Sequence, residues 1–349
     1  MVRNHRKVKK CLPHADAFSS CKDLMANQVL RWFVWILGIA AFLGNLFVIV
    51  WRIKQKDLGK VHTLLIWNLA VADFLMAIYI FIIASVDMNY RGVYIRYDES
   101  WRSSQLCSFA GFLVTLSSEM SVFLLTVITL DRFLLIVFPL KYIRMHLKAA
   151  IIIVVVSWIV VAFLSFLPLI GIPYFGDNFY SRSPVCLSLH LTNEKTPGWI
   201  YSVVIFIFLN FLSFIAISIM YLAMYLSIRR TNLATGVQLQ QRARETAAIA
   251  KRMSLIVLTD FFCWVPIAVM GMLAMTDTIT IPGSVYAWTA VFILPINSAI
   301  NPFLYTISVI KKREKPMRPT VTATVDTVVY AYEEMEKRGI IPDDLLVTL

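Results

Sequence analysis

The side chains of this chain with the greatest capacity for chemistry are polar ones that interrupt long apolar stretches. They are Asn45, Asp73, Glu119, Asn210, Asp260, Asn297 and Asn301. An ionisable side chain at the centre of a lipid bilayer costs about 2.5–3.5 kcal/mol, so such residues need partners and often mark functional sites. Asn45 and Asn210 are explained equally well as hydrogen-bonded packing contacts between helices. The carboxylates, together with two asparagines one helical turn apart, favour a functional site.

The polar residues nearest the C-terminal end recur with helical spacing. Asn297, Asn301 and Tyr305 follow one another every four residues, so they share one face of a helix. Pro302 removes a backbone hydrogen bond beside them and loosens that turn.

A second proline hinge is predicted in the preceding apolar segment. Asp260 and Trp264 share a helix face by the same spacing, and Pro266 kinks that helix nearby. A purely structural bundle would avoid both the charges and the kinks. We therefore predict that Asp260, Trp264, Pro266, Asn301 and Pro302 form a switch between two helix packings.

The composition indicates that lipid surrounds the elements that carry these residues. Of the 349 residues, 59% are hydrophobic and only 15% are charged, and the mean hydropathy is +0.71. A soluble domain has about 25% charged residues. The net charge of +12 is compatible with nucleic acid or with an anionic membrane leaflet. The hydropathy favours the lipid bilayer and predicts no nucleic-acid partner.

Seven segments are long enough to cross a hydrocarbon core, which takes roughly 20 residues of helix. Long apolar runs without alternation exclude a β-barrel, so we predict an all-α bundle of seven transmembrane helices. The segments are Val29–Trp51, Leu64–Ala84, Phe109–Val137, Ala149–Ile170, Ile200–Ile228, Met253–Met275 and Val285–Ile310.

Charge asymmetry predicts how the bundle is oriented. Lysine and arginine predominate in the first, third and fifth connections and after the last span, which the positive-inside rule places in the cytoplasm. A basic cluster within the first ten residues disagrees. We predict a short extracellular N-terminus (1–28), a seven-transmembrane domain (29–310) and a cytoplasmic tail (311–349) with a short helix at 327–338.

Two cysteines are predicted to lie on the outer side of the membrane. Cys107 is at the mouth of the third span, and Cys186 is in the second outer loop. The outer compartment is oxidising, so a disulfide between them is chemically permitted and would hold the loop over the helix mouth. The alternative is two free thiols.

Short motifs in successive spans carry a family resemblance. The chain resembles rhodopsin-type G-protein-coupled receptors over about Val29–Ile307. The matching stretches are Gly44-Asn45, Leu69-Ala70-Val71-Ala72-Asp73, Trp101, Cys107, Asp131-Arg132-Phe133, Trp158, Cys263-Trp264-Val265-Pro266 and Asn301-Pro302-Phe303-Leu304-Tyr305. Each motif alone is weak, but all of them in order, one per expected helix, are specific.

A finer resemblance is to the leucine-rich-repeat-containing receptors, and among them to the relaxin receptors. It rests on Ser118-Glu119-Met120-Ser121, Ala250-Lys251-Arg252-Met253, Tyr90-Arg91-Gly92-Val93-Tyr94, Ile281-Pro282-Gly283 and the run Phe292–Ala299. Three features depart from the pattern. Only about 28 residues, without any repeat, precede the first span, the tail from Lys311 matches nothing in that family, and Phe133 replaces the usual tyrosine.

The resemblance implies a mechanism of signalling. An outer agonist would favour one helix arrangement, and the sixth helix would swing outward to admit a heterotrimeric G protein. Arg132 is expected to contact that partner after release from Asp131, with help from Tyr221 and Tyr305. The alternative is that Asp131 and Arg132 form a plain surface ion pair at a helix end.

The resemblance also implies a buried sodium pocket formed by Asp73, Ser121, Asn297 and Asn301. A hard cation prefers oxygen ligands, and a carboxylate in lipid requires a compensating charge. Asp260 is expected to compete for the two asparagines and to lock the sixth helix to the seventh. No other cofactor is expected.

Absent residues narrow the ligand class. The seventh span has no lysine for a retinal Schiff base, and the third has no aspartate near Val114 for an amine. These absences leave a peptide or protein agonist, and the resemblance implies a relaxin-like hormone receptor at the plasma membrane that modulates cAMP. The alternative is a truncated, non-signalling decoy or scaffold with the same fold. A transporter would show internal repeats, and an enzyme a nucleophile–base pair or metal cluster; the sequence shows neither.

Overall fold

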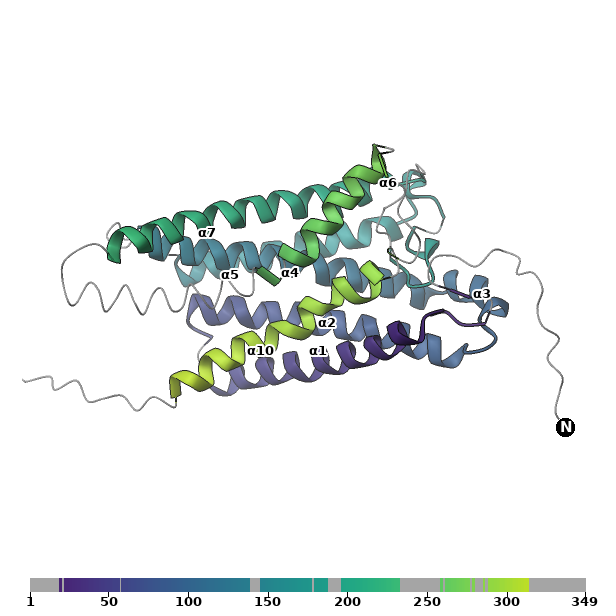
Figure 1. Ribbon diagram of the computed structural model, residues 1–349, viewed down its shortest axis with the longest axis horizontal. Coiled ribbons are helices and arrows are strands. Elements are labelled where there is room, and N and C mark those ends of the chain that lie inside the picture. Colours follow the sequence, from purple (N-terminus) through teal and green to yellow (C-terminus); the bar gives the residue numbers. More distant parts are fainter. Residues whose placement is uncertain are drawn as a thin grey trace, which may run out of the picture. The chain divides into compact units, whose positions relative to one another are not determined.

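The computed structural model describes residues 19–20, 22–56, 58–138, 145–177, 179–187, 196–232, 258–259, 261–276, 278–279, 285 and 288–313. Across these residues every regular element is helical (Figure 1). The chain divides into two compact units, Met1–Thr306 and Ile307–Leu349. The first unit contains all of the sites considered below.

Five helical segments within the described residues are long and apolar enough to cross a membrane, and two shorter apolar helices follow them. The first four are α1 (Gln28–Lys54), α2 (Val61–Asn89), α4 (Gln105–Val137) and α5 (Leu147–Phe166). The fifth runs through α6 (Trp199–Ser202), the π-helical η5 (Val203–Leu209) and α7 (Asn210–Asn232). Helix Phe261–Met275 lies in the predicted sixth span, and the π-helical η6 (Thr289–Ile293) leads into α10 (Leu294–Arg313) as the seventh. The prediction of an all-helical seven-span bundle is confirmed.

Helices α1, α2 and α7 extend beyond the predicted apolar limits because their ends lie where polar groups are tolerated. Arg52 and Lys54 belong to the last turn of α1, where cations also complement the helix dipole. At the other end of α1, the Asn27 side chain accepts hydrogen bonds from the backbone N–H groups of Val29 and Leu30. Ser104 caps α4 by accepting from the N–H of Cys107, and this bond fixes the cysteine in the first helical turn.

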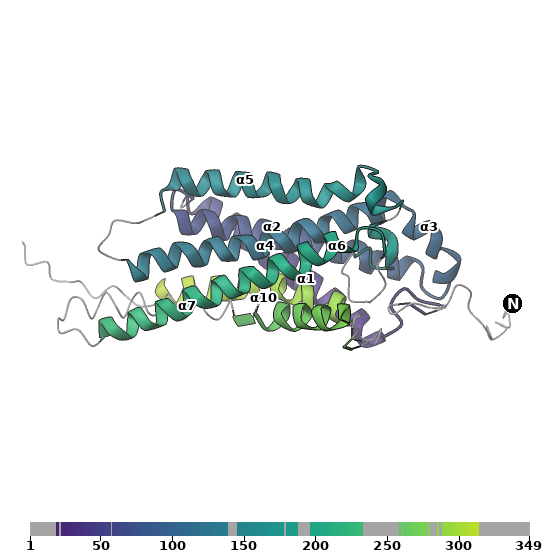
Figure 2. The same cartoon turned by 90° about the horizontal axis from the view of Figure 1, so that it is seen from above.

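Helices α2 and α4 form the interior of the bundle, and α5 lies at its side (Figure 2). Leu65 and Leu69 of α2 and Met120 and Leu124 of α4 are fully buried in one cluster. By contrast, α5 buries a single stripe whose members recur every three or four residues: Ala150, Val154, Ser157, Val161 and Ser165. Most of the rest of its surface carries the exposed aliphatic and aromatic side chains expected of a lipid-facing helix.

The outer connections contain short helices that the sequence did not predict. They are η1 (Tyr94–Arg96), α3 (Asp98–Arg102), η2 (Leu167–Leu169), η3 (Pro173–Phe175) and η4 (Tyr180–Arg182). The predicted tail helix at 327–338 and the basic N-terminal cluster lie outside the described residues. The division at 28/29 and 310/311 stays a prediction.

Candidate functional site

The first polar site is centred on Asp73, a fully buried residue of α2. Its carboxylate accepts hydrogen bonds from Ser121 Oγ of α4 (3.2 Å), Ser298 Oγ of α10 (2.9 Å) and Asn301 Nδ2 of α10 (2.9 Å). Three helices distant in sequence are therefore joined through one carboxylate. We call Asp73, Ser121, Ser298 and Asn301 the Asp73 cluster.

Asn45 extends this cluster to α1. Its amide Nδ2 donates to the carbonyl oxygens of Ala41 (2.8 Å) and Ser298 (2.9 Å). In the same way Asn210 Nδ2 donates to Glu119 Oε1 (3.2 Å) and to the Phe206 carbonyl (3.1 Å), so that α7 is joined to α4. Both asparagines make the contacts between helices that the packing interpretation predicts.

The Asp73 cluster differs in one member from the predicted sodium pocket. Asp73, Ser121 and Asn301 lie together, but Ser298 takes part and was missed. Asn297 is buried, and its two amide atoms have no hydrogen-bond partner among the described residues. Ser298 carried no signal of its own, because serine is common in membrane helices and the rotation of α10 decides which neighbour faces Asp73.

The chemistry of the cluster fits a small hard cation. Asp73 supplies two carboxylate oxygens, and Ser121 and Ser298 each supply a hydroxyl oxygen. The Oδ1 atom of Asn301 is buried and has no partner among the described residues, so it is another available oxygen. An all-oxygen ligand set of this kind suits Na⁺ better than a transition metal.

The second site is the Asp131–Arg132 pair near the end of α4. Arg132 Nη2 lies 3.2 Å from Asp131 Oδ2, and the two side chains are only 13% and 5% exposed, respectively. This burial argues against the alternative of a plain surface ion pair. Arg132 Nε is buried without a partner among the described residues, so the guanidinium keeps an unused donor.

The predicted neighbours of Arg132 are described to different extents. Tyr221 of α7 packs with Phe133, Ile136 and Met224 in a small apolar cluster beside the end of α4. Tyr305 belongs to α10, but its side chain lies outside the described residues. Its role at the G-protein surface stays a prediction.

The predicted switch in the sixth span is described only in part. Trp264 is 4% exposed and packs in the main core, whereas Pro266 lies on the exposed side of helix Phe261–Met275. Asp260 lies outside the described residues, so its bond to Asn297 or Asn301 stays a prediction. Pro302 is inside α10, as predicted.

The third site is a folded layer on the ends of the helices that the charge pattern predicts to lie outside, and we call it the outer cap. It consists of residues 19–27 without residue 21, the first outer loop (90–104) and residues 179–187 of the second. Cys107 and Cys186 form the predicted disulfide, so the alternative of two free thiols is wrong. Tyr79 donates to the Val185 carbonyl (2.9 Å) and Trp101 Nε1 to the Pro184 carbonyl (2.8 Å).

The segment before α1 is held in the outer cap by one buried aspartate. Asp87 of α2 accepts from the Met25 backbone N–H (2.8 Å) and from Arg31 Nε (2.5 Å). Arg31 also donates to the Met25 carbonyl (2.9 Å). Leu24 and Met25 are 0% and 1% exposed, so this short segment is part of the core.

Electrostatics reinforce the first outer loop. The Tyr94 hydroxyl is buried and donates to the Asp98 carboxylate, and both effects raise the pKa of Tyr94 above its ordinary value. Arg102 donates to the same carboxylate (2.8 Å) and to the Arg182 carbonyl (3.2 Å). The two outer loops are therefore joined to each other as well as to the helices.

Tyr180 of the second outer loop fills a notch that a glycine leaves in α4. A Cβ atom added at Gly111 would lie 2.4 Å from Tyr180 Cγ, far inside the contact distance of two carbon atoms. The Tyr180 hydroxyl donates to the Ser165 carbonyl of α5 (2.7 Å), and the side chain is 1% exposed. The notch therefore determines where the loop sits.

We expect Gly111→Ala to displace Tyr180 and loosen the outer cap, because the added methyl cannot coexist with the ring. Overpacking of this kind typically costs about 1–3 kcal/mol. Thermal unfolding of the purified protein should show a lower Tm for Gly111→Ala. Once Tyr180→Ala has removed the ring, adding Gly111→Ala should lower the Tm less than it does in the wild type. Additive losses would contradict the notch.

Comparison with known proteins agrees with this architecture. Residues 44–305 match the sequence profile of the 7 transmembrane receptor (rhodopsin family). The chain is 51% identical over 299 residues to G-protein coupled receptor GRL101 of Lymnaea stagnalis, covering 86% of this chain and 26% of that protein. It is 40% identical to relaxin receptor 2 of Canis lupus familiaris and 37% identical to relaxin receptor 1 of Mus musculus. Each alignment covers 86% of this chain, and 41% and 39% of the respective relatives.

These findings support the resemblance drawn from the motifs. The chain spans about a quarter to two fifths of the length of the relatives it matches, so the activity of those whole proteins enters only as a proposal. The matched family consists of receptors rather than enzymes, and its apolar helices indicate a multi-pass protein of the plasma membrane. This chain belongs to the rhodopsin family of seven-transmembrane receptors and is related to the relaxin receptors.

Proposed function

We propose that this receptor transmits an extracellular peptide or protein hormone signal, relaxin-like in kind, to a heterotrimeric G protein and so modulates cAMP. The observation that carries the proposal is the buried Asp131–Arg132 pair at the end of α4, beside Tyr221. A buried arginine with an unused donor can form new contacts once its carboxylate partner is released.

The orientation of the bundle in the membrane follows from the chemistry of the end opposite Arg132. A disulfide persists in an oxidising compartment, so Cys107–Cys186 supports an outer-cap side that faces the extracellular space. The end of α4 that carries Arg132 then faces the cytoplasm. The basic residues of the last turn of α1 and of the connections on the same side agree with this orientation.

The outer cap is the surface on which the agonist acts in this proposal. Val185, Cys186 and Leu187 are at most 1% exposed and belong to the main core, so this part of the second outer loop packs into the end of the bundle. A hormone bound on the outer side would act by shifting this loop. The loop would transmit that shift through the Cys107 disulfide to α4 and through Tyr79 to α2.

The Asp73 cluster supplies the second half of the switch. We propose that Na⁺ is held by Asp73, Ser121, Ser298 and Asn301, with Asn297 one helical turn away on α10. A bound cation supplies the positive charge that a carboxylate in a low-dielectric interior lacks. The cluster holds α2, α4 and α10 in one packing, and the agonist would have to break these bonds to favour another.

Substitution of the Asp131–Arg132 pair tests the proposed function. We expect Asp131→Asn to raise ligand-free cAMP signalling at least twofold, because it releases Arg132 from its only described ion-pair partner. Arg132→Ala should abolish both ligand-free signalling and the response to relaxin-like peptides. The measurement is cAMP in transfected cells, normalised to the receptor at the cell surface.

Lys148→Ala is the matched control for charge, since this exposed residue lies in the first turn of α5 on the same side of the membrane. Equal responses of the wild type and Arg132→Ala would favour a non-signalling decoy or scaffold.

A further inference from the structure

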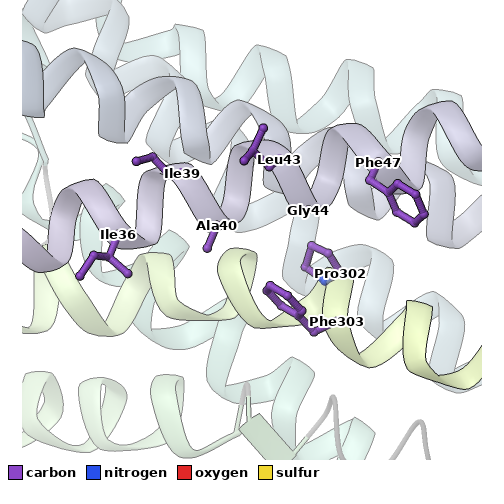
Figure 3. A pocket seen from close by; sticks show the side chains of 8 residues that line it. All are labelled: Ile36, Ile39, Ala40, Leu43, Gly44, Phe47, Pro302 and Phe303. Atoms are coloured by element: carbon purple, nitrogen blue, oxygen red, sulfur yellow. The ribbon is translucent and has the colours of Figure 1, made fainter.

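A groove on the lipid-facing side of the bundle runs between α1 and α10 (Figure 3). It has a volume of about 520 Å³ and is lined by Ile36, Ile39, Ala40, Leu43, Gly44, Phe47, Pro302 and Phe303. We call these eight residues the α1–α10 groove. All of them belong to the first compact unit of the chain.

The groove exists because the two helices touch at a residue without a side chain. A Cβ atom at Gly44 would lie 2.8 Å from Cβ of Pro302, so the helices meet closely at this point. Larger side chains stand on either side of it and form the walls. Ile36, Leu43 and Phe303 are 58%, 59% and 55% exposed, which shows that nothing in the described chain covers the groove.

The lining decides the chemistry of the occupant. None of the eight residues has a polar side chain, so a hydroxyl or an amide placed in the groove would lose its hydrogen bonds to water without replacement. A sterol hydroxyl or a polar peptide is therefore disfavoured inside it. A hydrocarbon chain has no such requirement and gains the packing contacts that a concave surface offers.

One end of the groove is marked by a positive charge. The groove residues of α1 recur at helical spacing, at positions 40, 43 or 44, and 47, and the same spacing continues to Trp51 and Lys54. Lys54 is therefore on the face of α1 that lines the groove. The Trp51 ring stacks on Phe47, with centroids 5.6 Å apart, and tryptophan typically lies at the membrane–water interface. Lys54 is exposed in the last turn of α1, where its long side chain can reach a headgroup.

The dimensions match one leaflet. Half of a hydrocarbon core is about 15 Å, which equals about ten residues of α-helix at 1.5 Å per residue. Counted from Trp51, this depth ends near Ala41, so that Phe47, Gly44 and Leu43 all fall within it. An acyl chain whose headgroup lies beside Lys54 therefore has the length to fill this half of the groove.

We propose that the α1–α10 groove binds one acyl chain of an anionic phospholipid from the leaflet at the C-terminal end of α1, with the phosphate beside Lys54. The lipid would cover the seam where α1 meets Pro302, one of the two prolines of the predicted switch. The bound lipid would thereby favour the helix packing in which Gly44 and Pro302 remain in contact.

Photo-crosslinking in nanodiscs tests this proposal with the full-length receptor. The probes are phosphatidylglycerol and phosphatidylcholine that carry the same diazirine-labelled acyl chain, and labelled residues are identified by mass spectrometry. We expect phosphatidylglycerol to label Leu43, Phe47 and Phe303 about fivefold more than phosphatidylcholine does. That factor corresponds to about 1 kcal/mol for one lysine near an anionic lipid.

Two variants separate the headgroup from the chain. Lys54→Gln should reduce the ratio of phosphatidylglycerol to phosphatidylcholine labelling to about one, whereas Lys148→Gln, the matched exposed lysine on α5, should not. Ala40→Phe, which places a ring at the deep limit of the half of the groove that the acyl chain fills, should lower labelling by both probes. Val156→Phe adds the same ring to the exposed face of α5 and is the control for it.

Three results would overturn the proposal. Leu46 and Val50 are exposed on α1 outside the groove. If they were labelled as strongly as the groove residues, the probes would be reporting bulk lipid. An unchanged labelling ratio in Lys54→Gln would remove the headgroup site. The third result is that neither probe labels the groove while the receptor forms dimers that Ala40→Phe abolishes. That result would show that a second copy of the chain occupies the groove.

Discussion

Asp73→Ala is expected to lower the Tm of the purified receptor and to abolish its agonist response. The substitution removes the common acceptor of Ser121, Ser298 and Asn301. Each buried donor that loses its partner costs about 1–3 kcal/mol, so the three together should destabilise this packing by at least about 3 kcal/mol. Thermal unfolding in detergent and cAMP in cells measure the two effects.

Asp73→Asn separates hydrogen bonding from charge. Asparagine keeps one acceptor oxygen, and Asn301 can turn its amide so that its unpartnered Oδ1 meets the new amide nitrogen. We therefore expect a much smaller loss in Tm than for Asp73→Ala. Added Na⁺, compared with a large organic cation, should raise the Tm of the wild type but of neither variant. A sodium effect of equal size in Asp73→Asn would contradict the proposed ion site.

Loss of the Cys107–Cys186 disulfide is the second large effect that we expect. The bond joins residues 79 apart in sequence, and closing a loop of that size restricts the unfolded chain by about 4 kcal/mol. The bond also holds the second outer loop over α4, where Cys186 is fully buried. Cys107→Ala and Cys186→Ala should each reduce the receptor at the cell surface at least several-fold and remove the hormone response.

A double-mutant comparison identifies the cause of that loss. If the bond itself matters, Cys107→Ala/Cys186→Ala should be no worse than either single variant, because the second substitution removes nothing further. Cys263→Ala is the matched control, since Cys263 is not part of a disulfide. Losses that add in the double variant would show that each cysteine acts through its own packing instead.

Hydropathy and charge predicted the spans because a bilayer leaves the backbone few alternatives. The grouping of Asp73, Ser121 and Asn301 came from the resemblance to rhodopsin-type receptors, and it agrees with the need of buried polar groups in lipid for partners. Ser298 could not be chosen over Asn297 from the sequence. The choice depends on how α10 is rotated against α2, and the rotation depends on the packing of the whole bundle.

Apart from the Cys107–Cys186 disulfide, the outer cap could not be predicted either. Residues 22–27 are few and mixed in polarity, and nothing in them announces that Leu24 and Met25 are core residues. Gly111 likewise gives no hint that Tyr180, 69 positions further along the chain, fills its notch. Such contacts depend on loops whose shape is set by long-range partners rather than by local periodicity.

The π-helical stretch Val203–Leu209 bears on how residue roles are transferred between receptors. A π turn accommodates about one residue more than an α turn, which offsets all later side chains by roughly 100°. A residue-by-residue alignment with a relative whose helix is regular would therefore misplace Asn210, and every later residue of α7, by one position. Deleting a single residue inside the stretch would restore a regular α-helix and leave Asn210 facing Glu119, because the deletion removes the one residue that the π turn takes up.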